Sequence, residues 1–435
     1  MTEEGRIRPV RGTKRGNMFR FLHAADIHLD SPLKGLARYE GAPAERVRNA
    51  SRRALERLVE TAVGARVAFV LLAGDLYDGD WPDYNTGLFF ASQLAELRRA
   101  GIPVVLIAGN HDAQNRMTRS LRLPEGVALL SAEAPETIVL DKPAVAIHGQ
   151  SFAMPAVEEN LALRYPDPRK GLFNIGLLHT SVAGQQGHDP YAPCTLEDLR
   201  TRQYDYWALG HIHRRAILCN DPPIAYAGNV QGRHIRESGA KGCLLVTVDD
   251  ARSVSTEFVP LDVLRWETVI LDAGSLATAD ELPPLVEREL RTCWAAAEGR
   301  ALAVRVEVHG PTPAHGEFVA ERAKWTNEVR AAALHAGRGE AWVEKVCFAT
   351  TAPLRTAGQE SADGAWGELH ALIEELRNDP AALAEMGGEL GELARRLPAE
   401  LRDGPEGARL DDPAWLATRL GEVEPLLRTR LQEEG

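Results

Sequence analysis

The chain is 435 residues long, which is more than one compact core usually serves, so we expect a main domain with one or two smaller parts. Hydrophobic residues make up 44% and charged residues 26%, and no apolar run approaches the roughly 20 residues of a membrane helix, which argues against a membrane protein. The net charge of -12 argues against a protein that coats nucleic acid non-specifically, so any contact with phosphates must be local or metal-mediated.

The cysteines and the N-terminus both bear on the cellular compartment. The five cysteines are scattered and never form a C-x-x-C pair, so neither a disulfide framework nor a zinc knuckle is predicted. Residues 1–17 carry basic side chains without the apolar segment of a secretory signal, and we predict that they are a disordered leader. These features together predict a cytoplasmic protein.

From residue 19 to about residue 248, short apolar runs alternate with helical patterns, which predicts a layered α/β domain over residues 18–255. Helices are expected around residues 54–62 and 88–97, where apolar side chains recur every three or four positions. Two stacked sheets flanked by helices would accommodate the strands. The strand-like runs are residues 19–25, 67–73, 103–108, 144–149, 174–179, 205–210, 223–228 and 243–248.

Two smaller parts follow the α/β domain. Residues 262–353 alternate strand-like and helix-like runs, which predicts a small separate α+β domain. Residues 354–435 contain only amphipathic helical patterns, with eighteen acidic side chains, nine basic ones and no lysine. The sequence leaves open whether this acidic helical region binds a partner or packs into a bundle of its own.

Residues that can bind metals follow five of the predicted strands. Ligands of open α/β sheets bind beyond the carboxyl ends of the strands, so these residues can converge on one rim of the domain. A lone histidine or a Gly-Asp pair is more often structural, but five strand ends with suitable residues rarely coincide by chance. The residues are Asp26, His28, Asp75, Asn110, His179, His211 and His213.

A two-metal site accounts for these residue types. Two cations roughly 3.5 to 4 Å apart need a bridging carboxylate, a mixed shell of oxygen and imidazole ligands, and open positions for a substrate phosphate and a nucleophile. Asp75 suits the bridge. Without a thiolate, the ligand set favours manganese, iron or zinc over a structural zinc site. We assign Asp26, His28 and His213 to one metal, and Asn110, His179 and His211 to the other.

His111 lies beside Asn110 and is left without a metal to bind. It could donate a hydrogen bond to a phosphoryl oxygen or protonate the leaving alkoxide, and Asp112 could orient its imidazole. His111 and Asp112 are therefore the predicted catalytic residues. Three glycines beside the ligands would let the backbone turn sharply and leave room for a phosphate. They are Gly74, Gly109 and Gly210.

In this order, the motifs D-x-H, G-D-x-x-D, G-N-H-D, H and G-H-x-H resemble those of the calcineurin-like metallophosphoesterases. Within that superfamily the chain is similar to the SbcD and YhaO type of DNA repair exonuclease. The resemblance covers residues 19–248 strongly and continues loosely to about residue 353. It is carried by DIHLDSP (26–32), GDLYDGDW (74–81), PVVLIAGNHD (103–112) and YAGNVQGRHIRESGAKG (226–242).

The resemblance implies a four-layer α/β fold, two metal ions usually taken to be manganese, and cleavage of phosphodiester bonds in DNA. It also implies that residues 262–353 cap the site, and that a coiled-coil ATPase of the SbcC type and a second copy of the chain are partners. One position departs from the pattern. Some relatives in the double-strand-break repair branch have a histidine three residues after the bridging aspartate, where this chain has Asp78, and this puts the direction and strength of exonuclease activity in question.

A cationic segment contains Arg233, His234 and Arg236, and it is predicted to be either a clamp for the DNA backbone or a solvated loop. The leading functional prediction is a two-metal DNA exonuclease in DNA repair. One alternative is a phosphodiesterase or phosphatase acting on a small nucleotide or a phosphoprotein, because the same site serves all of these. The alternative of another class is a scaffold that keeps the fold without the chemistry.

Overall fold

The computed structural model describes residues 18–31, 49–78, 84–114, 123–182, 191–353, 365–397, 407–421 and 423. The predicted leader, residues 1–17, lies outside the described residues. The chain divides into two compact units, one formed by Met1–Glu267 with Gly299–Ala303 and the other by Thr268–Glu298 with Val304–Gly435. In the described part of the chain, every helix is too short or too polar to cross a bilayer.

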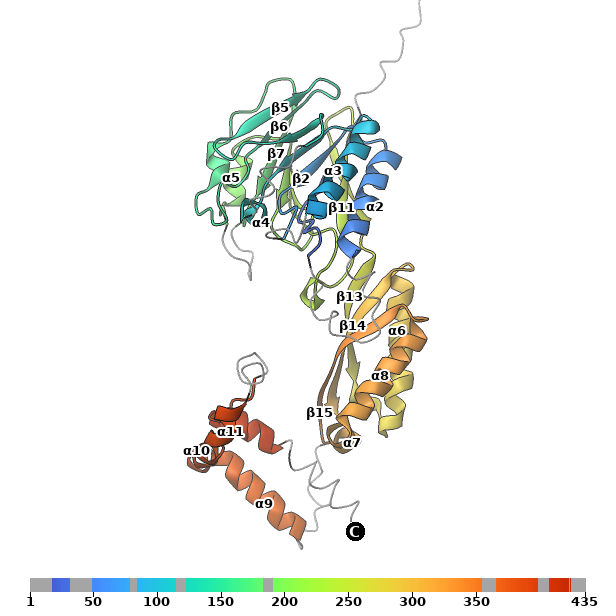
Figure 1. The fold of residues 1–435 in the computed structure, drawn as a ribbon, viewed down its shortest axis with the longest axis vertical. Coiled ribbons are helices and arrows are strands. Elements are labelled where there is room, and N and C mark those ends of the chain that lie inside the picture. Colours follow the sequence, from blue (N-terminus) through green and yellow to red (C-terminus); the bar gives the residue numbers. More distant parts are fainter. Residues whose placement is uncertain are drawn as a thin grey trace, which may run out of the picture. The chain divides into compact units, whose positions relative to one another are not determined.

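The first unit contains two six-stranded mixed sheets (Figure 1). In the first sheet four neighbouring strands are parallel, and the two strands at one edge pair antiparallel. In the second sheet four neighbouring strands are parallel, and the strand at each edge is antiparallel. The first sheet has the order β12 (Val254–Pro260), β11 (Gly242–Val248), β1 (Phe19–Ala24), β2 (Phe69–Ala73), β3 (Val104–Ile107), β4 (Val127–Leu129). The second has the order β5 (Glu136–Leu140), β6 (Val145–Gly149), β7 (Phe173–His179), β8 (Tyr206–Gly210), β10 (Pro223–Tyr226), β9 (Ala216–Asn220).

Strand β2 illustrates why the central strands are apolar throughout. Successive side chains of a strand point to opposite faces, and both faces of β2 are covered. Phe69 and Leu71 pack into a core between the two sheets, which also contains Ile147 and Ile175 of the second sheet. Val70 belongs to a second core, which the first sheet shares with two helices. The two sheets therefore stack face to face.

Helices complete the layers on both sides of the stacked sheets. Helices α2 (Ala50–Gly64) and α3 (Tyr84–Arg99) bury their apolar stripes against the first sheet. The outer face of the second sheet is covered by a 3-10 helix, Leu161–Arg164, and by α5 (Leu196–Arg200), with Trp207 fully buried beneath them. The result is the α/β fold with helix-flanked mixed sheets that the sequence predicts.

The eight predicted strands of this unit are all present, with ends within two residues of the predicted ones. The structure adds four strands that the sequence analysis did not predict. These are β4, β5, β9 and β12, each of which is an edge strand of its sheet and is partly exposed. All residues of these strands are at least partly exposed, so their positions do not require the long apolar runs that mark the central strands.

A three-stranded sheet follows, with the order β13 (Leu264–Asp272), β14 (Ala301–Pro311), β15 (Ala341–Thr351). It carries helices α6 (Leu282–Ala296), α7 (His315–Ala320) and α8 (Arg322–Ala336) (Figure 1). Buried side chains of α6 and α8 provide its core, including Trp325. The first residues of β13 pack in the first unit, where the indole N–H of Trp266 donates to the carbonyl of Gly232 at 3.0 Å. The predicted bounds of the small α+β domain, residues 262–353, stay a prediction.

Most of the described residues of the acidic region are helical. Helices α9 (Ala365–Asn378), α10 (Pro380–Glu389) and α11 (Gly391–Arg396) follow one another, and residues 413–421 form a further helical segment. Asp379 begins α10, where its carboxylate accepts hydrogen bonds from the N–H groups of Ala381 and Ala382. Leu383 of α10 and Leu416 are buried. The role of this region stays a prediction.

His23 of β1 is a buried polar side chain between the two stacked sheets. Its Nε2–H donates to the carbonyl of Leu209 at 3.1 Å, and Nδ1 lies 3.0 Å from the Tyr206 hydroxyl, which then acts as the donor. Both contacts suit a neutral ring. Burial lowers the pKa of His23 to about 4, although the carbonyl of Leu209 opposes the shift.

We predict that His23 makes the first unit sensitive to acid. The unfolded chain takes up a proton at His23 near pH 6.5, whereas the folded chain does so only near pH 4, so stability is complete above pH 6.5 and falls as the pH approaches 4. The loss at pH 4 should be about 3 kcal/mol. Urea unfolding of the wild type and of His23→Gln between pH 7 and pH 4 measures it. Equal pH dependence in both proteins would contradict the prediction, and the exposed His335→Gln serves as the control.

Candidate metal centre

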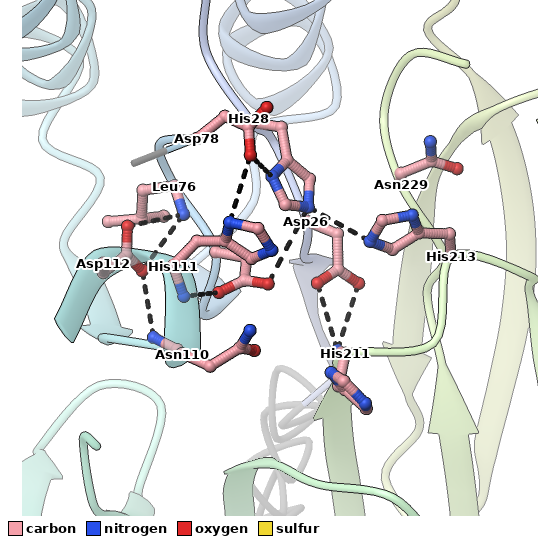
Figure 2. A network of polar contacts seen from close by, with 12 residues as sticks. Asp26, His28, Leu76, Asp78, Asn110, His111, Asp112, His211, His213 and Asn229 are labelled. Carbon is pink, nitrogen blue, oxygen red and sulfur yellow. Dashed lines mark hydrogen bonds and ion pairs between the residues drawn. The ribbon is translucent and has the colours of Figure 1, made fainter. Parts of the chain in front are cut away.

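The seven predicted ligands lie together at the carboxyl ends of strands from both sheets. Figure 2 shows Asp26, His28, Asn110, His211 and His213 among them. They form two clusters that share Asp75, and within each cluster the candidate ligand atoms lie within 4.8 Å of one another. Asn110 joins the second cluster, because its Oδ1 lies 3.0 Å from Nε2 of His179. The first cluster is Asp26, His28, Asp75 and His213, and the second is Asp75, His179 and His211.

The backbone at this edge is strained. Asp26, His28, Asp75 and His211 have φ values of 51°, 44°, 50° and 97°, which side-chain-bearing residues rarely adopt. Hydrogen bonds hold these turns, since the Asp26 N–H donates to Gly74 O at 3.0 Å and the His28 N–H to Asp75 O at 3.0 Å. The His211 N–H donates to the Asp26 carboxylate at 3.1 Å. The turns allow adjacent positions to aim side chains at a common point.

The glycines beside the ligands make room for side chains of the site. A Cβ at Gly109 would lie 2.3 Å from Asp75 Oδ1, and one at Gly210 would lie 1.9 Å from the carbonyl oxygen of Ala73. Gly74 has a φ of 90°, and its Cβ would meet the ring of His179 at 2.5 Å. The space predicted for a phosphate is therefore filled by Asp75, His179 and backbone, so these glycines serve close packing of the two sheets.

The surroundings of His179 suit a cation. Its Nδ1–H donates to Ala73 O at 2.8 Å, so in the neutral ring Nε2 carries a lone pair. This nitrogen faces Asn110 Oδ1 at 3.0 Å and Asp75 Oδ2 at 3.5 Å. Burial disfavours a charged ring, but the Asp75 carboxylate outweighs it and raises the pKa of His179 to about 9. Acceptor atoms that converge in this way need a positive charge between them, either a proton or a metal ion.

The surroundings of His213 lead to the same conclusion. Nδ1–H of His213 donates to Glu237 Oε1 at 2.7 Å, and its Nε2 lies 3.1 Å from Nε2 of His28. Nδ1 of His28 is buried and lies 3.7 Å from Asp78 Oδ1. Two imidazole nitrogens that face each other beside two buried carboxylates fit a divalent cation. The donor set therefore fits two metal ions, while the assignment of each ligand stays a prediction.

His111 lies on the open side of the clusters (Figure 2). It belongs to the short helix α4 (Asn110–Gln114), its backbone N–H donates to Asp75 Oδ1 at 3.0 Å, and its side chain is 34% exposed. Its Nδ1 lies 3.0 Å from Asp78 Oδ1. The hydrogen bond to Asp78 is the main cause of a raised pKa of His111, which favours the charged ring. Asp78 is therefore the carboxylate that orients His111.

The carboxylate of Asp112 contacts backbone N–H groups, whereas the sequence predicts that it contacts the His111 ring. Its carboxylate accepts backbone hydrogen bonds from Leu76, Tyr77 and Gly109 at 2.9 to 3.1 Å. It is buried, and burial together with the Asp75 charge raises the pKa of Asp112 to about 7. No hydrogen bond from the His111 ring to Asp112 is found among the described contacts, and the carboxylate beside that ring is Asp78. The catalytic role of Asp112 stays a prediction. Asp112 holds the two ligand loops together.

The three basic residues of the predicted clamp differ in their exposure. Arg233 is 17% exposed, and its guanidinium lies 3.2 Å from Glu237 Oε1 and 3.6 Å from Asp78 Oδ2. His234 is 32% exposed and lies 3.5 Å from Glu237, and Arg236 is exposed. His234 and Arg236 can reach a substrate, whereas Arg233 already faces two carboxylates. The clamp itself stays a prediction.

Two residues of the site were missed by the sequence analysis, Asp78 and Glu237. Asp78 had been noted only for replacing a histidine of some relatives, although its spacing of three residues from Asp75 was visible in the G-D-x-x-D motif. Glu237 lies four residues after Arg233, which gave a weak signal, because such pairs are common on exposed helices. Only the folded arrangement of the loops shows which histidine each carboxylate contacts.

Comparison with known proteins agrees with this geometry. The family profile of the calcineurin-like phosphoesterases matches residues 19–215, and that of the middle domain of the metallophosphoesterase YhaO matches residues 266–351. The chain is 36% identical to the uncharacterized metallophosphoesterase YhaO of Bacillus subtilis over 313 residues, which cover 70% of this chain and 74% of that protein.

Two further proteins are similar to the chain. The DNA double-strand break repair protein Mre11 of Methanopyrus kandleri is 26% identical over 287 residues, which cover 59% of this chain and 60% of that protein. Among solved structures, TT1561 of Thermus thermophilus aligns with 55% of this chain and 99% of its own, at 13% identity and a TM-score of 0.32.

We predict that Asp112→Ala mainly lowers stability. The substitution leaves the N–H groups of Leu76, Tyr77 and Gly109 without their acceptor in a buried place, which should cost roughly 3 to 5 kcal/mol. Urea unfolding of the metal-free protein measures the loss. Asp198→Ala, which removes an exposed carboxylate at the start of α5, should cost about 1 kcal/mol. Wild-type stability with lost turnover would instead favour the orienting role expected from sequence.

We predict that Asp78→Asn lowers kcat by about tenfold or more, because the His111 ring loses its charged partner. KM, metal content and melting temperature should stay close to those of the wild type. Steady-state hydrolysis of a chromogenic phosphodiester measures kcat and KM. The effect should disappear in a His111→Ala background, and an equal loss in that background would show that Asp78 does not act through His111.

Proposed function

The chain belongs to the calcineurin-like metallophosphoesterase family, and from this membership we propose that it is a two-metal DNA phosphodiesterase that works as an exonuclease in DNA repair. Family membership and the clustered ligands support phosphoester hydrolysis. The step to DNA is carried by one observation, the similarity to a DNA double-strand break repair protein over 287 residues. Manganese is the proposed metal, with iron and zinc as alternatives.

The residues of the site have distinct tasks in the proposed reaction. Asp26, His28, Asp75 and His213 would hold one cation, and Asp75, His179, His211 and Asn110 the other. Two divalent cations bound there would neutralise charge on a phosphate and lower the pKa of water.

His111 is the exposed donor of the site. With Nδ1 directed to Asp78, its Nε2 is free to donate a hydrogen bond to a phosphoryl oxygen or a proton to the leaving oxygen. Its backbone N–H donates to Asp75, and this hydrogen bond fixes the position of His111 relative to the metal ligands. His234 and Arg236 would contact phosphates further along the strand.

The proposal extends to parts of the chain beyond the site. The α+β part would restrict which DNA ends enter, and a coiled-coil ATPase of the SbcC type and a second copy of the chain are the proposed partners. The strongest alternative is an enzyme for a small phosphodiester or a phosphoprotein, because the same ligands and the same histidine would serve those substrates.

We predict that the purified protein shortens end-labelled DNA when manganese is present and leaves it intact when the metal is chelated. His111→Ala should reduce the rate by roughly 10² to 10⁴, the usual contribution of a positioned acid or base, while metal content stays unchanged. Gel analysis of single- and double-stranded substrates measures the rate and gives the polarity. Parallel reconstitution with iron and zinc identifies the preferred metal.

Two controls make the result specific. The exposed His335→Ala, on α8, should retain the wild-type rate. A small chromogenic phosphodiester is assayed beside the DNA. Turnover of the small ester with intact DNA would replace the nuclease proposal by a small-substrate phosphoesterase, and no turnover of either, with both metals bound, would favour a scaffold.

A further inference from the structure

Glu237 is a buried carboxylate at the edge of the metal centre, where only 6% of its side chain is exposed. It ends a short 3-10 helix, Ile235–Glu237, and its oxygens collect several donors. Oε1 accepts from Nδ1 of His213 at 2.7 Å and lies 3.2 Å from the guanidinium of Arg233. Oε2 accepts from the side-chain amide of Asn229 at 2.9 Å and from the backbone N–H of Arg233 at 2.7 Å.

These contacts keep Glu237 ionised and fixed. The guanidinium of Arg233 and the N–H groups of Asn229 and Arg233 all face its oxygens, and these contacts favour the charged carboxylate. A carboxylate that accepts several hydrogen bonds cannot rotate away without leaving buried donors unsatisfied. The carboxylate is therefore a rigid acceptor for one ring nitrogen of His213.

The segment that carries Glu237 is itself held in place. The Lys241 ammonium donates to the carbonyl of His213 at 3.1 Å. The side-chain amide of Gln231 donates to Leu264 O at 2.6 Å. Gly232 has no room for a Cβ, which would lie 2.9 Å from the Trp266 ring. The backbone and the side chain of His213 are thus both bound to residues 229–241.

We propose that Glu237 is a positioning residue, which fixes the orientation and tautomer of His213 so that Nε2 is presented to a metal ion. The proposal rests on the two-metal site of the proposed function. Donation of Nδ1–H to Glu237 leaves Nε2 unprotonated, and this nitrogen lies in the cluster with Asp26, His28 and Asp75. A ring free to rotate would present the protonated nitrogen part of the time.

Arg233 adds a link to the other end of the site. Its guanidinium lies between Glu237 and Asp78, and Asp78 in turn contacts Nδ1 of His111 at 3.0 Å. The carboxylates that orient the ligand His213 and the exposed His111 therefore share one cation. This arrangement assigns Arg233 to positioning, a role outside the two alternatives, a DNA clamp or a solvated loop, that the sequence left open.

The test is the affinity of the metal-free protein for manganese, measured by calorimetry with Glu237→Gln. Glutamine replaces one acceptor oxygen by a donor group, so the contacts to His213, Asn229 and Arg233 cannot all be kept. We expect the affinity of one of the two metal sites to fall by roughly 10 to 100-fold, while the other site keeps its affinity. If Glu237→Gln does not fold, Glu237→Asp, which withdraws the carboxylate from Nδ1, takes its place.

A double-substitution cycle separates positioning from a general structural effect. In a His213→Asn background, Glu237→Gln should cause no further loss of metal affinity, because the ring on which it acts is absent. Glu344→Gln is the matched control, since it breaks another half-buried Glu–Arg pair, with Arg305, outside the metal ligands. That control should leave manganese affinity unchanged.

Each outcome of the metal titration decides the proposal. Unchanged affinity at both sites, an equal loss at both, or a further loss in the His213→Asn background would overturn it. A wild-type protein that binds fewer than two manganese ions would overturn it as well. If both metals bind and Glu237→Gln behaves as expected, the proposal stands even if the protein does not cleave DNA. A failure of the proposed nuclease function is therefore distinguishable from a failure of this proposal.

Discussion

The carboxylate of Asp75 is the point on which the rest of the site depends. Oδ1 accepts the backbone N–H of His111 at 3.0 Å, and Oδ2 lies 3.5 Å from His179 and 3.8 Å from His28. One side chain of the first sheet is therefore close to ligands from both sheets. It can reach them only because the chain at Gly109 and Gly210 has no Cβ in the intervening space. A carboxylate shared by the two clusters therefore requires that the two sheets approach each other closely at this edge.

The sequence predicted the parts of the fold that burial controls. Strands such as β2 are apolar on both faces because both faces are covered, and this pattern is visible without a structure. Edge strands were not predicted, since β5 (ETIVL) and β9 (AILCN) are short and all of their residues are at least partly exposed. Because the central strands could be located from their apolar sequences, the residue types at their ends were sufficient to predict which residues form the two clusters of candidate ligands.

The contacts among the polar side chains were harder to predict. Asp112 follows His111 in sequence and was expected to orient it, but α4 turns Asp112 toward the backbone of Leu76, Tyr77 and Gly109. Asp78 takes that place from another loop. Neighbours in sequence on a helix point in different directions, so adjacency is a poor guide to contact. The partner of a histidine depends on how separate loops meet, which is a property of the packed fold.

Burial also separates residues that determine the chemistry from those that can select a substrate. Asp26, His28, Asp75 and His179 are buried and fixed by partners, whereas His234, which is not a predicted ligand, is 32% exposed. The chain as a whole carries a net charge of -12, so a polyanion would be attracted only where local cations and bound metals offset that charge. Choice of substrate then depends on residues outside the ligand set. Proteins that share the ligand motifs can for this reason hydrolyse different phosphoesters.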